Sequence, residues 1–182
     1  MLLNLKVCFI AFLLALSFSL DAKNEVDSLT QIINGNASDS LKATAADKLA
    51  WKFMFNNPDT TIIIANQQLV FAKSSGINKL IINALNNLAT ANAIKGDLDK
   101  AENIFLEAGE KAKAIDSPTE LSIVFNNLGL VYSMKSLPDS AINYYKNSLV
   151  QYNRQKELKK GKGDTYNNIG ILLMNKGDFD EA

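Results

Sequence analysis

Apolar residues recur along this chain in steps of three and four, the spacing that places side chains on one face of an α-helix. The clearest example lies between residues 81 and 108, where two such segments are separated by Gly96-Asp97. The first segment carries Leu85, Leu88, Ala89 and Ala93, and the second carries Ala101, Ile104, Phe105 and Ala108. Because glycine and aspartate interrupt a helical pattern, the stretch predicts two antiparallel helices joined by a short turn.

The same helix pair returns at a nearly constant interval. A Leu or Ile followed by Ala or Gly occurs in four evenly spaced copies, which are Leu49-Ala50, Leu88-Ala89, Leu128-Gly129 and Ile169-Gly170. A period of about 40 residues is typical of stacked helical repeats, in which each unit buries its apolar face against its neighbours. The pattern predicts an all-α solenoid with repeats at about 41–77, 78–117, 118–158 and 159–182, the last one truncated.

Prolines, caps and glycines fall where such hairpins need them. Pro58 and Pro138 lie just inside predicted second helices, where the missing N–H of proline costs nothing. Ser117-Pro118-Thr119-Glu120 predicts a capping box at a helix start. Gly129 and Gly170 lie in the middle of predicted helices, where glycine costs about 1 kcal/mol relative to alanine. We therefore expect them where a Cβ would hold two packed helices apart.

Residues 1–22 have the features of a secretory signal peptide. A single lysine precedes an almost wholly apolar run from Val7 to Leu20, about the length of a signal-peptide core, whereas a membrane-spanning helix needs about 20 apolar residues. We expect cleavage after Ala22 and export to the periplasm or cell envelope. The alternative is a retained N-terminal anchor. Residues 23–40 predict a lead-in helix and a polar connector that cover the open end of the first repeat.

Composition removes most of the usual catalytic groups. The 182 residues include no histidine, and the single cysteine, Cys8, lies in the N-terminal apolar segment. The commonest general base and the usual zinc ligand are therefore missing. We expect no catalytic site, no metal and no cofactor in this chain. The net charge is zero and Arg154 is the only arginine, which argues against a nucleic-acid partner because such proteins carry a concentrated basic face.

The repeated residues resemble tetratricopeptide repeats. In that family a small residue follows the Leu-Gly/Ala phrase by twelve positions, an aromatic residue comes four later and a small residue three beyond. The matching copies are Leu88, Ala89, Ala101, Phe105 and Ala108, and then Leu128, Gly129, Ala141, Tyr145 and Ser148. The first copy is the most degenerate, with Thr61 or Ile62 in place of the expected alanine.

The period is longer than the standard length of about 34 residues, so the chain is similar to the longer-helix subclass, whose members share the Asn-Asn-Leu-Gly phrase. The period alone also suits HEAT or armadillo arrays, but the fixed Gly/Ala-to-Ala spacing favours tetratricopeptide repeats. The resemblance implies a right-handed superhelix of antiparallel helix-turn-helix hairpins. It also implies that the first helix of each hairpin lines a concave face that binds a protein or peptide.

Candidate binding residues follow from this helical face, because positions i, i+4, i+7 and i+11 lie together. The candidates for peptide binding are Lys48, Trp51, Asn83, Asn87, Thr90, Asn127, Leu130 and Asn168. The same spacing also selects Thr44, Phe55, Ile94, Ile123, Met134, Asp164, Ile171 and Asn175. Lys48 is the lone cation on this face, whereas family members that bind a C-terminal carboxylate place Lys or Arg there in later repeats. Trp51 is a candidate either for a ligand anchor or for packing on the lead-in helix.

Asparagines form a ladder on this face, at Asn87, Asn127 and Asn168, with neighbours at Asn86, Asn126 and Asn167. Asparagine is a poor helix former, and its amide both donates and accepts hydrogen bonds. By the resemblance, long-helix members of the family use groove asparagines to hold a peptide backbone. The alternative is that the chain is simply rich in asparagine and that these amides tie one repeat to the next.

Together these observations predict an exported interaction module for a protein or peptide ligand. Membrane contact is expected only through the N-terminal segment or a downstream helix, and the oligomeric state stays open. The layout is similar to the N-terminal sensing region of bacterial sensor histidine kinases that contain tetratricopeptide repeats, and Ala182 falls inside a predicted helix, so we expect the front part of a longer protein. The alternatives are a substrate-docking region for an enzyme domain beyond Ala182 and a cytoplasmic regulator with a retained N-terminal anchor.

Overall fold

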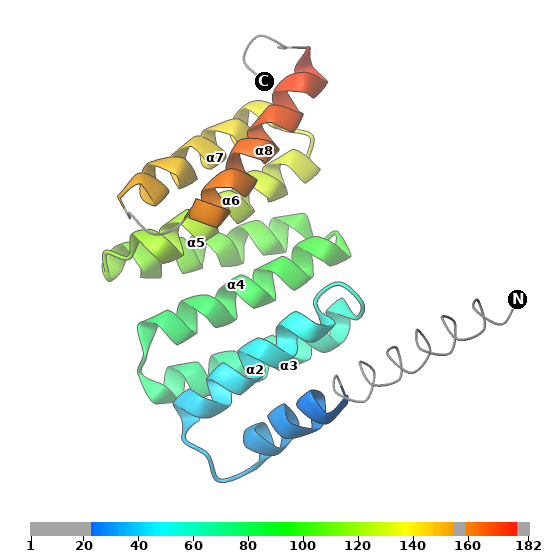
Figure 1. The fold of residues 1–182 in the computed structure, drawn as a ribbon, viewed down its shortest axis with the longest axis vertical. Helices are drawn as coiled ribbons and strands as arrows, with labels where there is room; N and C mark the ends of the chain where they lie inside the picture. Colours follow the sequence, from blue (N-terminus) through cyan, green and yellow to red (C-terminus); the bar gives the residue numbers. More distant parts are fainter. Residues whose placement is uncertain (1–22, 155–158, 178–182) are drawn as a thin grey trace, which may run out of the picture.

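The computed structural model describes residues 23–154 and 159–177, and every regular element in these ranges is an α-helix (Figure 1). A helix over residues 23–34 comes first. It is followed by α2 (Asp39–Phe53), α3 (Pro58–Ser75), α4 (Asn78–Lys95), α5 (Leu98–Ala114), α6 (Pro118–Met134), α7 (Pro138–Asn153) and α8 (Lys159–Lys176). The hairpins α2–α3, α4–α5 and α6–α7 stack along the long axis of the molecule (Figure 1). The predicted all-α hairpin array is confirmed. None of the described helices is long and apolar enough to cross a membrane.

The array curves toward the first helices of its hairpins. Helix α2 contacts α4, α4 contacts α6, and α6 contacts α8, whereas within the described ranges α3, α5 and α7 do not contact one another. The first helices therefore lie closer together than the second helices. This difference places α2, α4, α6 and α8 on the inner, concave side of the array.

In the α6–α7 hairpin, a small residue on α6 packs against an aromatic ring on α7. A Cβ at Gly129 would lie only 2.5 Å from Cδ1 of Tyr145, and Tyr145 is 1% exposed. Burial raises the pKa of this tyrosine to about 12. In the preceding hairpin, Ala89 and Phe105 are buried in one cluster. The expectation that Gly129 allows a close helix approach is confirmed.

The helix over residues 23–34 packs on the first hairpin. Leu29 and Ile33 are buried in a cluster with Ala46 and Leu49 of α2 and with Ile64 of α3. An ion pair of 2.5 Å between Lys52 Nζ and Glu25 Oε2 lies beside this contact. The apolar flank of the first hairpin, which has no preceding hairpin among the described residues, is covered in this way.

Helix ends follow the repeat period. Gly96 takes a left-handed conformation with φ of 90° after α4, and Ser136, at the equivalent place one repeat later, does the same after α6 with φ of 59°. Pro58, Pro118 and Pro138 each occupy the first turn of a helix. Left-handed residues and N-terminal prolines stop and start helices at fixed points, so the turns keep the hairpins in phase.

The predicted capping box at the start of α6 is only partly correct. The helix begins at Pro118 after the N-cap Ser117, but no described side chain caps the backbone there. Instead, the Ser117 hydroxyl donates to the Glu120 carboxylate. Glu120 also lies 3.6 Å from Nζ of Lys79 in α4. The reciprocal backbone bonds are absent because the Ser117 hydroxyl and the Glu120 carboxylate bond to each other, and Glu120 also contacts Lys79 of a neighbouring helix.

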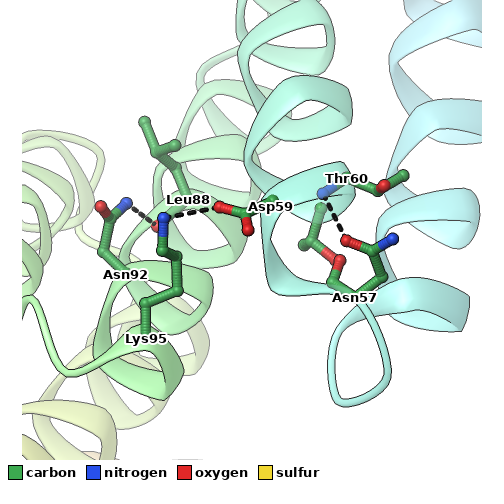
Figure 2. A network of polar contacts seen from close by, with 7 residues as sticks. Asn57, Asp59, Thr60, Leu88, Asn92 and Lys95 are labelled. Carbon is green, nitrogen blue, oxygen red and sulfur yellow. Dashed lines mark hydrogen bonds and ion pairs between the residues drawn. The ribbon is translucent and has the colours of Figure 1, made fainter.

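One ion pair recurs at successive junctions between hairpins. An aspartate in the first turn of each second helix contacts a lysine near the end of the next first helix. The pairs are Asp59–Lys95 at 2.5 Å (Figure 2), Asp99–Lys135 at 2.5 Å and Asp139–Lys176 at 2.6 Å. Each carboxylate lies near a helix N-terminus and each ammonium near a C-terminus, where the helix dipoles favour them. Such exposed pairs contribute little energy individually, but they mark the same register at each junction.

At the α5–α6 junction, this ion pair is part of a larger polar contact. Lys135 also donates to Glu102, and Glu102 accepts a second hydrogen bond from the hydroxyl of Tyr132. The Tyr132 ring stacks on Tyr144 with 5.0 Å between centroids. The hydrogen bonds from Lys135 and Tyr132 hold the pKa of Glu102 below its ordinary value, so this carboxylate stays charged at neutral pH.

We expect Gly129→Ala to lower the free energy of unfolding by about 1–3 kcal/mol, because the added methyl group would overpack against the Tyr145 ring. Gly109→Ala in α5 is the matched control, since a Cβ there would lie 3.4 Å from Val124 Cγ1, at ordinary contact distance. That variant should be neutral or gain up to about 1 kcal/mol from helix propensity. Urea unfolding followed by circular dichroism measures both, and equal effects of the two substitutions would contradict the close approach at Gly129.

Candidate functional site

A pocket of about 280 Å³ opens on the concave side between the first helices of three hairpins. We call it the groove pocket. The large apolar lining residues that are exposed to solvent are Trp51, Phe55, Ile94, Ile123, Leu130 and Met134. Its polar lining residues are Asn86, Asn87, Thr90 and Asn127. Helices α2, α4 and α6 or their ends supply these side chains, so the pocket exists only when the hairpins are stacked.

The exposure of these apolar side chains distinguishes the groove pocket. Trp51 is 55% exposed, Phe55 is 71% exposed and Leu130 is 46% exposed. Single exposed apolar residues are common, but a contiguous group of them marks a binding surface. All of the lining residues are uncharged at neutral pH. The pocket is thus an apolar surface with a few amide and hydroxyl groups.

The structure brings together most of the candidates selected from sequence. Trp51, Asn87, Thr90, Asn127 and Leu130 all line the groove pocket. Trp51 therefore lies in the groove, and the core cluster around the lead-in helix does not include it. Phe55, Ile94, Ile123 and Met134 were outside the candidate set, although the same helical spacing selects them.

The other three candidates lie elsewhere. Lys48 is exposed on α2 and is not part of the pocket lining. Asn83 lines a separate, open depression with Thr44 and Lys79. Asn168 lies on α8, beyond the three hairpins that form the groove pocket.

Asn87 belongs mainly to the junction between the first two hairpins. Its Nδ2 donates to Oδ1 of Asp47 at 2.8 Å and to Oε1 of Gln68 at 2.9 Å. Gln68 Nε2 in turn donates to Asp47 Oδ1 at 3.0 Å. Asn87 and Gln68 are buried. Both donor hydrogens of Asn87 are used within the protein, so only its Oδ1 is left for a ligand.

The side chains of Asp47, Gln68 and Asn87 thus form a closed ring of hydrogen bonds. The first hairpin can hold this ring because its packing residues differ from those of later hairpins. Gln68 stands where Ala108 and Ser148 stand one and two repeats later. Ala65 stands where Phe105 and Tyr145 supply rings. Position 65 carries no ring, and the fully buried Gln68 instead makes hydrogen bonds with Asp47 and Asn87. Thr61, which replaces the alanine expected earlier in this helix, is fully buried.

The remaining asparagines of the ladder divide between the two roles. Asn126 Oδ1 accepts a hydrogen bond of 3.0 Å from Thr165 Oγ1 of α8, so it ties two hairpins together. Asn127 is partly exposed and lines the groove pocket. Asn86 is buried and also lines the pocket, and its Oδ1 has no hydrogen-bond partner among the described residues.

A second buried amide, Asn92 of α4, lies outside the pocket lining. Its Nδ2 donates to the Leu88 carbonyl at 2.6 Å (Figure 2), and its Oδ1 has no partner among the described residues. Asn92 stands at the position that Tyr132 occupies one repeat later, where the third hairpin has a phenol bonded to Glu102. With asparagine instead of tyrosine at this position, the second hairpin has a buried acceptor without a partner, and such a group lowers the free energy of unfolding by roughly 1–3 kcal/mol.

In the described part of the chain, no group of three or more Asp, Glu, His or Cys residues is placed to hold a metal ion. The chemistry that the groove pocket offers is apolar contact together with hydrogen bonds from neutral groups.

We expect Asn87→Ala to lower the free energy of unfolding by about 1–3 kcal/mol, because it leaves the buried Gln68 Oε1 without its partner and removes one of the two hydrogen bonds to the half-buried Asp47. Asn127→Ala, at the equivalent position of the next hairpin, should change it by less than about 0.5 kcal/mol. Thermal unfolding of both variants checks this difference. Equal losses would show that the two asparagines share one role.

The comparisons with known proteins agree with this architecture. The family model described as "Tetratricopeptide repeat" matches residues 80–154, which include most of α4 and all of α5, α6 and α7. The comparison with curated proteins finds no match for this chain.

Among solved structures, the chain is similar to the crystal structure of BtubC (BKLC) from P. vanneervenii. The TM-score is 0.71 at 20% identity, over 91% of this chain and 69% of that chain. It is also similar to the crystal structure of MamA, with a TM-score of 0.56 at 21% identity, over 86% of this chain and 79% of that chain. At such identities the likeness concerns the fold alone. The matched residues 80–154 span nearly the whole of the second and third hairpins.

Proposed function

We propose that this chain is a scaffold that binds an apolar segment of a partner protein in the groove pocket. Tetratricopeptide repeats imply protein partners in general. The observation that carries the proposal is the convergence of exposed apolar side chains from three hairpins on the concave side, among them Trp51, Leu130 and Met134. Covering such a surface removes apolar area from water, which is the main favourable term in protein association.

The chemistry of the lining narrows the kind of segment. Among the described residues, no lysine or arginine lines the groove pocket, and Lys48 lies outside it, so the pocket offers no cation for a C-terminal carboxylate. Ligand pockets commonly range from about 300 to 1,000 Å³, and this one, at about 280 Å³, lies just below that range. It therefore suits one or two side chains of a segment that continues along the groove. Aromatic residues such as Trp51 are frequent anchors in interfaces of this kind.

We expect Leu130→Lys to weaken binding of capped apolar peptides at least about tenfold, because it places a charge in the apolar lining of the groove pocket. Val70→Lys is the matched control, since Val70 is 64% exposed on α3 and is not part of the groove pocket. An array of capped peptides graded by charge and apolar content, probed with both variants, measures the effect. The proposal is wrong if charged peptides bind best, or if the two variants lose binding equally.

We also propose that this chain is exported, and that its helical repeats serve as the sensing part of a longer signalling protein. The support is the sequence of residues 1–22, in which an apolar run lies between a lysine and a small residue, as in secretory signal peptides. These residues lie outside the described ranges.

We expect full-length protein expressed with residues 1–22 to be recovered from the cell envelope or periplasm with Lys23 at its N-terminus. A variant that lacks residues 2–22 should stay in the cytosol. Fractionation and N-terminal sequencing check both forms, and an unprocessed cytosolic full-length protein would contradict export.

A further inference from the structure

We infer that the partner segment is an amphipathic α-helix, which lies across the first helices of the array with its C-terminal end at α2 and its N-terminal end at α8. The inference rests on the proposed function and specifies the conformation of the ligand. It starts from a row of apolar side chains that continues past the groove pocket. Ile171 of α8 stands where Leu130 and Trp51 stand one and three repeats earlier, and it is 45% exposed. We call this row the apolar band, and its members, all exposed to solvent, are Trp51, Phe55, Ile94, Leu130, Met134 and Ile171.

The spacing of the apolar band favours a helical ligand. Neighbouring first helices contact each other from α2 to α8, and packed helices lie about 8–10 Å apart, so the band repeats at that distance and is roughly 24–30 Å long. A helix rises about 1.5 Å per residue, so its side chains return to one face after about 7 residues, or about 10 Å. Side chains on one face of an extended strand repeat at about 6.6–6.8 Å and fall out of step with the band.

The shortage of free amides in the groove pocket points the same way. An extended or polyproline segment leaves its backbone N–H and C=O groups unpaired, and such groups need partners along an apolar wall. Both donor hydrogens of Asn87 are used within the protein, and the Oδ1 of Asn86 is enclosed by it. The remaining lining amide is Asn127, which is partly exposed. A helix pairs its backbone internally, so it does not need a ladder of amides.

Charges at the two ends of the concave side set the direction of the helix. Lys48 of α2 and Asp164 of α8 occupy positions whose equivalents one repeat away, Asn87 and Ile123, line the groove pocket. Both are exposed, and neither forms an ion pair with a described residue. The pocket lining between them is neutral. Since a helix carries partial negative charge at its C-terminal end and partial positive charge at its N-terminal end, its ends complement Lys48 and Asp164 when it runs from α8 to α2.

The experiment uses the full chain and two capped, uncharged peptides of about 20 residues, the length of helix that spans the band. Both consist of the same numbers of Leu, Ala and Gln residues. The helix peptide has Leu at alternating intervals of three and four, which gives a helix one apolar face, and the strand peptide has Leu at every second position. Trp51 is the only tryptophan of the chain, so its fluorescence reports binding. We expect the helix peptide to bind at least about tenfold more tightly than the strand peptide.

Two further measurements test the conformation and the direction of the bound peptide. Carbon chemical shifts of isotope-labelled alanines in the bound helix peptide should be those of an α-helix. A nitroxide attached to the C-terminal end of this peptide should quench Trp51 more strongly than one attached to its N-terminal end, because Trp51 lies on α2.

A pair of variants tests the part of the band outside the groove pocket. Ile171→Lys places a charge on the band at α8 and should weaken binding of the helix peptide at least about threefold. Val150→Lys is the matched control, since Val150 is 57% exposed on the second helix α7, and it should leave binding unchanged.

The outcomes separate this inference from the proposed function. Equal binding of the two peptides, alanine shifts of an extended chain, stronger quenching by the N-terminal nitroxide, or equal effects of Ile171→Lys and Val150→Lys each overturn the inference. The proposed function then still stands if Leu130→Lys weakens binding of apolar peptides and Val70→Lys does not. If no apolar peptide binds, or if those two variants do not differ, the proposed function falls and the inference falls with it.

Discussion

The buried Tyr145 ring lies directly on the backbone of α6, because position 129 is glycine and a Cβ there would collide with the ring. The contact draws α6 and α7 together, and close packing of each helix pair leaves little freedom in how the next pair can stack. The first helices consequently touch along the inside of the array while the described second helices spread apart. The groove pocket is a result of this geometry, since its walls come mainly from first helices of separate hairpins.

Much of the fold was predictable from sequence because the signals are local and repeated. The helical spacing of apolar residues, the recurring Leu-Ala and Leu-Gly phrases and the prolines at Pro58 and Pro138 each reflect a requirement of one hairpin, met again in the next. Gly129 was predictable for the same reason, as a glycine in mid-helix has a cost that only close packing explains. Trp51 and Leu130 followed from the helical face alone.

The division of roles among the asparagines was not predictable in this way. From sequence, Asn87 and Asn127 are equivalent, yet only Asn87 meets Asp47 and Gln68. Those partners are distant in sequence and lie on other helices. The pattern of residues along α4 therefore cannot predict them. The start of α6 shows the same limit, because Glu120 contacts the Ser117 hydroxyl and Lys79 of another helix instead of making the expected capping bond to the backbone. Local patterns specify the elements, whereas polar side chains choose partners in three dimensions.

The ring formed by Asp47, Gln68 and Asn87 has a consequence for how similar hairpins find their correct order. Related units can exchange neighbours, within one chain or between two, and misassembly of this kind is a characteristic failure of repeat proteins. Here the second hairpin must bring an amide to a carboxylate and a glutamine that, among the described hairpins, only the first carries at those positions. Any other pairing would strand these groups without partners in a low-dielectric interior, at a high cost. The ring of hydrogen bonds therefore favours stacking of the second hairpin, and not another one, on the first hairpin.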